Sequence, residues 1–153
     1  MKDVSVMIGE AKFNYRVGLL IERDSEVLVE TNPAIDFVVF PGGRVKTLED
    51  SASALKREIK EEMGIDIDTN EIKLHSLFEN FFEYEGIKVH ELYILYKLEI
   101  KPDDKRFKDN MINMDSDASY YKWVNKDLKD VKLLPKELKG VIDSKEFTRV
   151  VVR

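Results

Sequence analysis

Residues 43–65 read Gly43-Arg-Val-Lys-Thr-Leu-Glu49-Asp-Ser-Ala-Ser-Ala-Leu-Lys-Arg57-Glu58-Ile59-Lys-Glu61-Glu62-Met-Gly64-Ile65. Apolar residues recur with helical spacing between residues 50 and 63, which predicts a helix there. Thr47 or Asp50 is the expected N-cap, and Gly64 is the expected C-terminal stop.

The acidic side chains of this helix gather on one side. With about 100° of rotation per residue, Glu61 lies near 300° and Glu62 near 40° when Glu58 is placed at zero. The three carboxylates therefore share one arc that borders the apolar face, and the basic side chains take the remaining arc.

A charged run is usually a solvated helix held by salt bridges, which would place opposite charges at i,i+4. Glu58 and Glu62 are instead a like-charge pair at this spacing, which costs roughly 0.2–0.5 kcal/mol. Arg57 and Glu61 form a favourable pair. Because hard divalent cations prefer carboxylate oxygens, often together with substrate phosphate, this arrangement predicts a cation site.

The run resembles the Nudix box, G-x5-E-x7-R-E-U-x-E-E-x-G-U with U aliphatic, and it matches at every defined position. The odds of a chance match in a chain of this length are on the order of one in ten million. The resemblance implies hydrolysis of a nucleoside diphosphate linked to another group, with divalent cations. It also implies an α/β/α sandwich in which a mixed sheet lies between helices.

The resemblance also suggests roles for the residues of the box. Glu58, Glu61, Glu62 and the carbonyl of Gly43 are the expected ligands of Mg²⁺, for which Mn²⁺ can substitute. Arg57 is expected to orient a neighbouring carboxylate, which its bidentate fork suits. Glu49, before the helix, is expected to stabilise the loop. Gly42 and Gly43 also suit a turn that ends a strand, and both readings of Gly43 can hold together.

Glu91 is the main candidate outside the box. Alternate positions along residues 87–99 bring it onto one strand face with Val89, Tyr93 and Leu95. A carboxylate in such apolar company is seldom left unpaired. In the Nudix family an acid on a strand beyond the box often joins the metal site or serves as the general base. A salt bridge at the strand end and an exposed register remain alternatives, and three nearby acids compete for the role: Glu79, Glu83 and Glu85.

The rest of the chain predicts an α/β fold with a mixed sheet in a single domain, residues 1–153. Glu85-Gly86 is the expected hairpin turn. Residues 101–117 predict a loop or lid, and Pro135 is expected to open a closing helix that ends near Ser144. Apolar runs predict strands at residues 15–23, 27–30, 37–40, 72–84, 87–100 and 120–124.

Composition limits the partners. A formal net charge of −5 argues against duplex nucleic acid as the main partner, because that partner needs a basic surface. A nucleotide is compatible, since bound metal ions can hold its phosphates in an acidic site. The sequence has no cysteine, which excludes thiolate zinc sites, cysteine nucleophiles and the isoprenoid diphosphate isomerases that share the Nudix fold. No signal peptide or membrane-spanning run is visible, so we expect a cytoplasmic protein without a membrane partner. The sequence is also compatible with a homodimer.

The substrate has to be inferred by elimination. No proline lies between Pro41 and Pro102, where ADP-ribose enzymes of the family often carry one, and the coenzyme A signature is not visible. Phe81, Phe82 and Tyr15, with Asn80, Phe37 and Phe40, could stack on a base or could belong to the core. A (d)NTP pyrophosphatase is therefore the expected activity. A hydrolase of dinucleoside polyphosphates or RNA 5′ ends and a non-catalytic nucleotide sensor remain alternatives.

Overall fold

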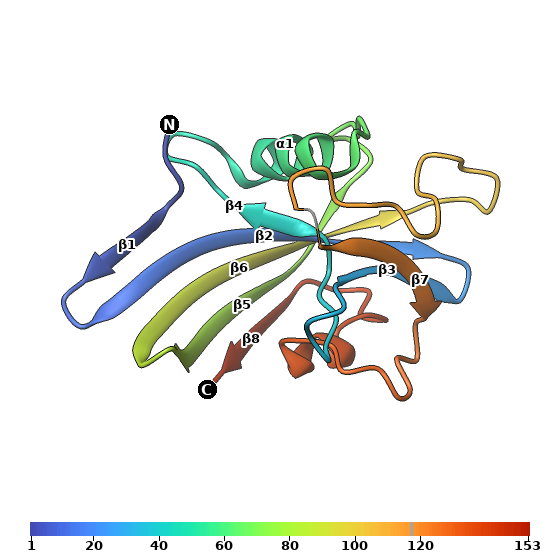
Figure 1. Cartoon of the computed structure of the whole chain (residues 1–153). Coiled ribbons are helices and arrows are strands. Elements are labelled where there is room, and N and C mark those ends of the chain that lie inside the picture. The colour runs from blue at the N-terminus through green and yellow to red at the C-terminus, as the bar shows by residue number, and fades with distance from the viewer. Residues whose placement is uncertain (117) are drawn as a thin grey trace.

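The computed structural model describes residues 1–116 and 118–153. One helix, α1, packs above a strongly twisted mixed sheet of eight strands (Figure 1). The main strand order is β7-β3-β2-β6-β5-β8, and β1 and β4 both pair with β2. The elements are β1 (Ser5–Ile8), β2 (Ala11–Arg23), β3 (Glu26–Thr31), β4 (Gly42–Arg44), α1 (Ser51–Met63), β5 (Lys73–Tyr84), β6 (Ile87–Glu99), β7 (Tyr120–Asn125), the 3-10 helix η1 (Lys136–Gly140) and β8 (Thr148–Val152).

The centre of the sheet is the long parallel pair of β2 and β6. β5 and β6 form the predicted hairpin, in which Tyr84 pairs with Ile87 and both Glu85 and Gly86 have positive φ. Positive φ at two successive turn residues matches the twist of the flanking strands. The predicted α/β class with a mixed sheet is confirmed. Two strands near the ends of the chain, β1 and β8, were not predicted.

The sheet divides beyond the turn that joins β2 to β3. These strands pair only at Glu22–Val27 and Arg23–Glu26 and then separate. The chain before α1 fills the resulting gap, because β4 pairs with β2 while Val39 bonds to Glu30 on β3. The strand expected at residues 37–40 is therefore wrong: only Val38 and Val39 form bridges there, and both are isolated. The same division brings the two glycines of β4 into the middle of the molecule.

Helix α1 begins and ends as its sequence predicts. Asp50 is the N-cap, since its side chain accepts from the backbone N–H of Ser53 at 2.9 Å. Gly64 ends the helix with φ 71°, a conformation that glycine adopts without steric cost. The apolar side of the helix packs into the first core cluster, which we call the helix-side core and which includes Val17, Leu19, Leu55, Ile59, Phe107 and Tyr121.

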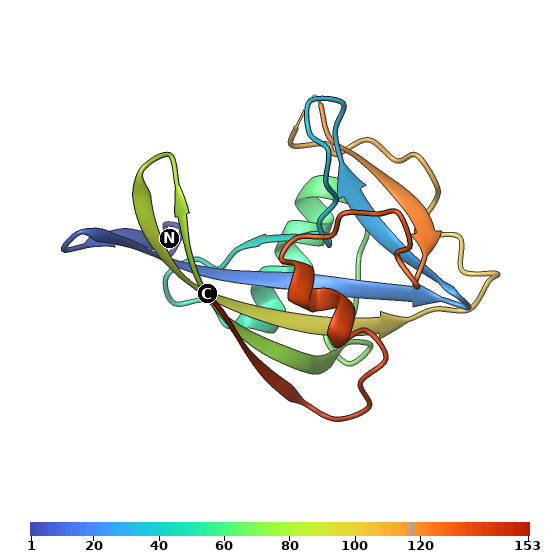
Figure 2. The same ribbon diagram turned by 90° about the horizontal axis from the view of Figure 1, so that it is seen from below.

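The opposite face of the sheet is covered differently. A second cluster, the η1-side core, includes Leu20, Phe40, Phe78, Tyr93, Leu95 and Leu138. Figure 2 shows η1 lying across this face. The predicted closing helix up to Ser144 is too long, because η1 stops at Gly140 and the chain then turns towards β8. The second helical layer is thus one short 3-10 helix.

The predicted loop between β6 and β7 is anchored to the domain. Phe107 is buried in the helix-side core, and its carbonyl accepts from Trp123 Nε1 at 3.1 Å. Arg106 binds Glu71 at 2.9 Å. Position 117, the last of the predicted loop, lies outside the described residues.

In the part of the chain that the structure describes, no helix is long and apolar enough to cross a membrane.

Candidate active site

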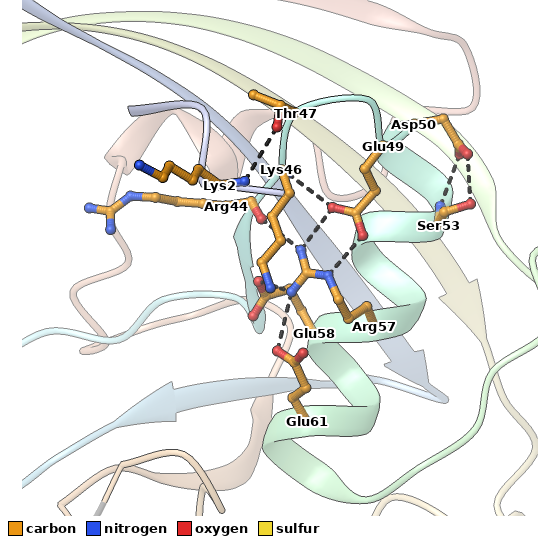
Figure 3. A network of polar contacts seen from close by, with 10 residues as sticks. All are labelled: Lys2, Arg44, Lys46, Thr47, Glu49, Asp50, Ser53, Arg57, Glu58 and Glu61. Carbon is orange, nitrogen blue, oxygen red and sulfur yellow. Dashed lines mark hydrogen bonds and ion pairs between the residues drawn. The ribbon is translucent and has the colours of Figure 1, made fainter. Parts of the chain in front are cut away.

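Arg57 is the centre of a polar network on the first turns of α1 (Figure 3). Its Nε and Nη2 donate to the two carboxylate oxygens of Glu49 at 2.8 and 2.9 Å, and Nη2 also donates to the carbonyl of Arg44 at 3.0 Å. Its Nη1 donates to Glu58 at 2.7 Å and to Glu61 at 3.2 Å. One guanidinium therefore ties the preceding loop to two box carboxylates, which suits the expected positioning role.

Glu49 has the contacts of a loop-stabilising residue. Besides Arg57, its carboxylate accepts from the backbone N–H of Lys46 at 2.9 Å. The hydrogen bonds from Arg57 hold the pKa of Glu49 below its usual value, so the carboxylate stays ionised in the network.

The two glycines of β4 are required by close approach. A Cβ at Gly43 would collide with the carboxylate of Glu58, and a Cβ at Gly42 would collide with the carbonyl oxygen of Val17 on β2. The turn expected at these glycines is instead a short strand. The Glu58 carboxylate consequently lies directly against the backbone of Gly43, as a site using both groups as ligands would need.

Glu62 lies one helical turn beyond Glu58 on the same side of α1. Tyr121 Oη donates to its carboxylate at 3.1 Å. Burial, helped by the nearby carboxylate of Glu30 on β3, raises the pKa of Glu62 to about 8. Burial also raises the pKa of Glu58, which is 9% exposed, although Arg57 opposes the rise. Two of the three box carboxylates therefore pay an electrostatic cost when ionised without a nearby cation.

The box carboxylates line a polar cavity of about 380 Å³, which we call the acidic cavity. Glu58, Glu61 and Glu62 all border it, as do Gly43 and Asp115. Its rim also carries cationic side chains from different segments: Arg16, Arg44, Lys46 and Arg57. Carboxylates and cations around one cavity are a combination that can hold a metal ion together with phosphate groups.

The donor set fits Mg²⁺ with one qualification. Among the described residues, no three acidic or histidine side chains already surround one point at metal-binding spacing. Mg²⁺ commonly takes one or two carboxylates and completes its octahedral shell with water and substrate phosphate. The box offers hard oxygen ligands, and two of its carboxylates, Glu58 and Glu62, have a raised pKa. These ligands therefore fit an ion that binds together with the substrate.

A second cavity adjoins the acidic cavity. This apolar cavity has a volume of about 370 Å³ and shares Arg16 and Gly42 with its neighbour. Its other lining residues come from distant parts of the chain: Val17, Val39, Phe40, Asn80, Phe82, Glu91, Tyr93, Leu134, Pro135 and Val152. The volume lies near the lower end of the range for small-molecule sites, roughly 300–1,000 Å³.

Glu91 lies in the wall of the apolar cavity rather than among the residues that line the acidic one. It accepts a hydrogen bond from Asn80 Nδ2 at 3.1 Å. The strand face predicted for Glu91 is right, since Tyr93 and Leu95 on the same face belong to the η1-side core. This face is turned away from α1, which packs on the other side of the sheet. The strand face therefore does not by itself place Glu91 beside the box glutamates, as was expected.

The aromatic candidates separate into two groups. Phe82 and Phe40 line the apolar cavity. Tyr15 instead packs against the helix-side core, and Phe81 stacks on His90 with ring centroids 4.5 Å apart. The expectation that Tyr15 and Phe81 contact the substrate is therefore not supported by their positions, because each points to the opposite sheet face from Phe82.

The sequence pattern did not single out three residues that lie around the site: Arg16, Tyr121 and Glu30. Arg16 borders both cavities, and Tyr121 and Glu30 surround Glu62. An arginine inside an apolar strand run was the one available hint, since a charged residue in a buried strand usually has a specific role.

Comparison with known proteins agrees with this site. The family model described as the NUDIX domain matches residues 12–149. A search of curated protein sequences gave no match. Among solved structures, a mutator MutT protein from Bacillus halodurans has a TM-score of 0.69 at 20% identity, with 89% of this chain and 86% of that chain covered. An Ap4A hydrolase from C. elegans has a TM-score of 0.54 at 24% identity, with 85% and 93% covered.

These structural likenesses support the fold, and the family model covers nearly the whole chain. The matched region includes the complete box, the Arg57 network and both cavities except Asp3 and Val152 at their edges. The chain therefore belongs to the Nudix family and is a Nudix pyrophosphohydrolase.

Proposed function

We propose that this chain is a divalent-cation-dependent (d)NTP pyrophosphatase, which releases a nucleoside monophosphate and pyrophosphate. The observation that carries the proposal is the junction of the two cavities at Arg16 and Gly42. A nucleoside triphosphate has a flat aromatic base with a polar edge at one end and a charged triphosphate at the other. The apolar cavity suits the base in size and character, and the acidic cavity suits the phosphates with their cation.

The rim of the acidic cavity can bind phosphate oxygens directly. Arg16, Arg44 and Lys46 come from two strands and a loop and border the same space. The Nε of Arg44 is buried and has no hydrogen-bond partner within the described part of the chain. A buried donor without a partner is costly, and a phosphate oxygen would satisfy it.

Glu58, Glu61, Glu62 and the Gly43 carbonyl are the groups that would hold Mg²⁺. When bound, the ion would neutralise phosphate charge and lower the pKa of a coordinated water molecule. The attacking water oxygen forms a new bond to phosphorus as the P–O bond of the anhydride breaks, and one carboxylate accepts the proton of the water. Glu61, whose side chain is 40% exposed at the cavity, can take this proton, while Arg57 keeps Glu58 and Glu61 in place.

Dinucleoside polyphosphates and RNA 5′ ends are the rival substrates. The C. elegans structure mentioned above is an Ap4A hydrolase, so this fold can accompany that activity. Such a substrate would need a second base site or an RNA channel. The apolar cavity offers space for a small ligand, which favours a substrate with one base.

A product-resolved activity screen tests the proposal. The purified protein would be given Mg²⁺ and, in separate reactions, each (d)NTP, Ap4A, ADP-ribose, coenzyme A and 5′-triphosphorylated RNA. We expect the highest kcat/KM with a (d)NTP and pyrophosphate as the second product. Much faster cleavage of Ap4A or RNA, or release of single phosphate from (d)NTPs, would contradict the proposal.

A further inference from the structure

A row of polar side chains crosses the sheet beside the apolar cavity. Ser5, Asn14, Glu91 and Asn80 are successive Cα partners on β1, β2, β6 and β5. Asn14 is 7% exposed and Asn80 is 3% exposed, so these are buried polar groups in a mainly apolar face. Buried polar groups are normally hydrogen-bonded, and the partners of this row therefore need to be identified.

Asn80 has one satisfied and one unsatisfied end. Its Nδ2 donates to Glu91 Oε1 at 3.1 Å, which fixes the orientation of the amide because the reverse orientation would set two acceptors against each other. Its Oδ1 is buried and has no hydrogen-bond partner among the residues that the structure describes. Asn80 also lines the apolar cavity, so a ligand there can supply the missing donor.

Glu91 adds a second acceptor beside the first. An ionised carboxylate only accepts hydrogen bonds and has several lone pairs, of which Asn80 uses one. Glu91 lines the same cavity, so that the cavity wall presents adjacent acceptors from Asn80 and Glu91. A ligand that complements this wall must present N–H or O–H donors.

The remaining walls orient a base towards this pair. Phe82, Leu134 and Pro135 give apolar surfaces, and Phe82 is 45% exposed. Arg16, which is shared with the acidic cavity, marks the side on which the phosphates would lie. A nucleotide with its phosphates at Arg16 has its base within the apolar cavity and its polar base edge available to Asn80 and Glu91.

We propose, building on the (d)NTP pyrophosphatase function, that Asn80 and Glu91 read the base edge and select nucleotides whose base carries an exocyclic amino group. The amino groups of cytosine, adenine and guanine donate hydrogen bonds, whereas uracil and thymine have a carbonyl in place of the cytosine amino group. Against the acceptor pair, that carbonyl would leave Asn80 Oδ1 unsatisfied and would be repelled by the Glu91 carboxylate.

The closest matched pair of substrates is CTP and UTP, which have nearly the same shape. We expect the wild-type kcat/KM for CTP to exceed that for UTP by about 10- to 100-fold. Glu91→Gln, whose amide can donate to the uracil carbonyl, should bring this ratio close to one. Asn80→Leu, which removes one of the two acceptors, should lower the ratio. Binding of CMP and UMP without metal, measured by calorimetry, should show the same order of preference.

Glu79→Gln is the matched control for Glu91→Gln. Glu79 lies on β5 next to Asn80 but on the opposite face, where it pairs with Arg149 at 2.6 Å. The control should keep the wild-type CTP/UTP ratio. An equal kcat/KM for the two triphosphates, or an unchanged ratio in Glu91→Gln, would overturn the inference.

The inference and the proposed function fail in different ways. If no (d)NTP is hydrolysed, the pyrophosphatase proposal fails. The preference for CMP over UMP then decides whether Asn80 and Glu91 form a base reader, that is, a pair that selects the base by its edge. If (d)NTPs are hydrolysed without discrimination, the function stands and the base reader is wrong. Should Asn80→Leu fail to fold, Glu91→Gln decides alone, because Glu91 is only partly buried.

Discussion

The acidic cavity and the apolar cavity share Arg16 and Gly42, but their walls come from different parts of the chain. Most of the acidic lining lies between residues 42 and 62, and helical spacing aligns those of its side chains that lie on α1. The apolar lining extends from residue 16 to residue 152 and combines five strands, β2, β4, β5, β6 and β8, with the segments before β4 and before η1. We infer that the reaction depends mainly on local sequence and the choice of substrate mainly on the tertiary fold.

The largest effect should come from the carboxylates of the acidic cavity. Glu61→Gln and Glu62→Gln should each lower kcat/KM by about 10³-fold or more, because charge stabilisation through a bound metal is worth several kcal/mol. The metal-free protein should be as stable as wild type or slightly more stable, since like charges are removed. Steady-state kinetics and thermal melting with and without Mg²⁺ measure both effects.

Lys56→Gln is the control, because it removes a charge from an exposed position of the same helix. It should keep wild-type turnover. Full activity in both glutamate variants would show that the box carboxylates do not form the metal site.

Disturbing the network behind these carboxylates should have a smaller effect. Arg57→Lys keeps the charge but loses the fork that binds Glu49, Glu58 and Glu61. Partners that orient metal ligands typically contribute about 10- to 100-fold, so we expect kcat to fall by that factor. Arg106→Lys is a matched control, since Arg106 also binds two carboxylates, Asp104 and Glu71, but outside both cavities. Equal kcat in the two variants would leave Arg57 with a structural role alone.

In the apolar cavity, two neighbouring phenylalanines give an internal comparison. Phe82→Ala should raise KM by about tenfold if its ring stacks on the base, with little change in melting temperature because Phe82 is 45% exposed. Phe81→Ala should leave KM unchanged, since its ring packs on His90 instead. The stacking role is wrong if both variants alter KM equally, or if Phe82→Ala changes only the melting temperature.

The smallest expected effect is on the pH dependence of stability. The folded pKa of Glu62 is raised to about 8 from an ordinary value near 4.5, so the folded protein binds an extra proton between these values. This contribution is fully present below about pH 4.5 and is lost as the pH rises through about 8. Between pH 5.5 and pH 8.5, the melting temperature of the metal-free wild-type protein should therefore fall relative to that of the Glu62→Gln variant.

The comparison with the variant is needed because His75 acts in the opposite direction. Burial lowers the pKa of His75, so its contribution to stability increases as the pH rises towards about 6.5. That contribution is the same in both proteins and cancels in their difference. Parallel melting curves across pH 5.5–8.5 would show that Glu62 is not protonated in the folded state.

Features set by neighbouring residues were predictable. The Asp50 cap, the Gly64 stop and the turn at Glu85-Gly86 were each confirmed, because their geometry depends on a few adjacent residues. The closing helix was predicted too long. Its apolar spacing continues through Val141 and Ile142, which are buried, but as a turn rather than as further helix.

Residues whose role depends on a sheet face were harder to predict. A period of two separates Phe81 from Phe82 and places Glu91 with Tyr93, yet it does not say which face meets α1. That choice decides whether a side chain reaches the acidic cavity, the apolar cavity or the core. For Tyr15, both base stacking and a place in the core stayed open, and the structure packs it against the helix-side core.

By itself, the sequence was sufficient for the family, through the complete box, and for the α/β class. It was also sufficient for the alignment of the box carboxylates, because helical spacing from Glu58 to Glu62 brings them to one side whatever surrounds the helix. The tertiary structure alone decided which residues complete the site. It divided the sheet between β2 and β3, inserted Gly42 and Gly43 into the gap, and brought Arg16, Asn80 and Glu91 to one cavity from three strands. Such contacts depend on strand order and register, which involve residues too far apart in the chain for local spacing to specify.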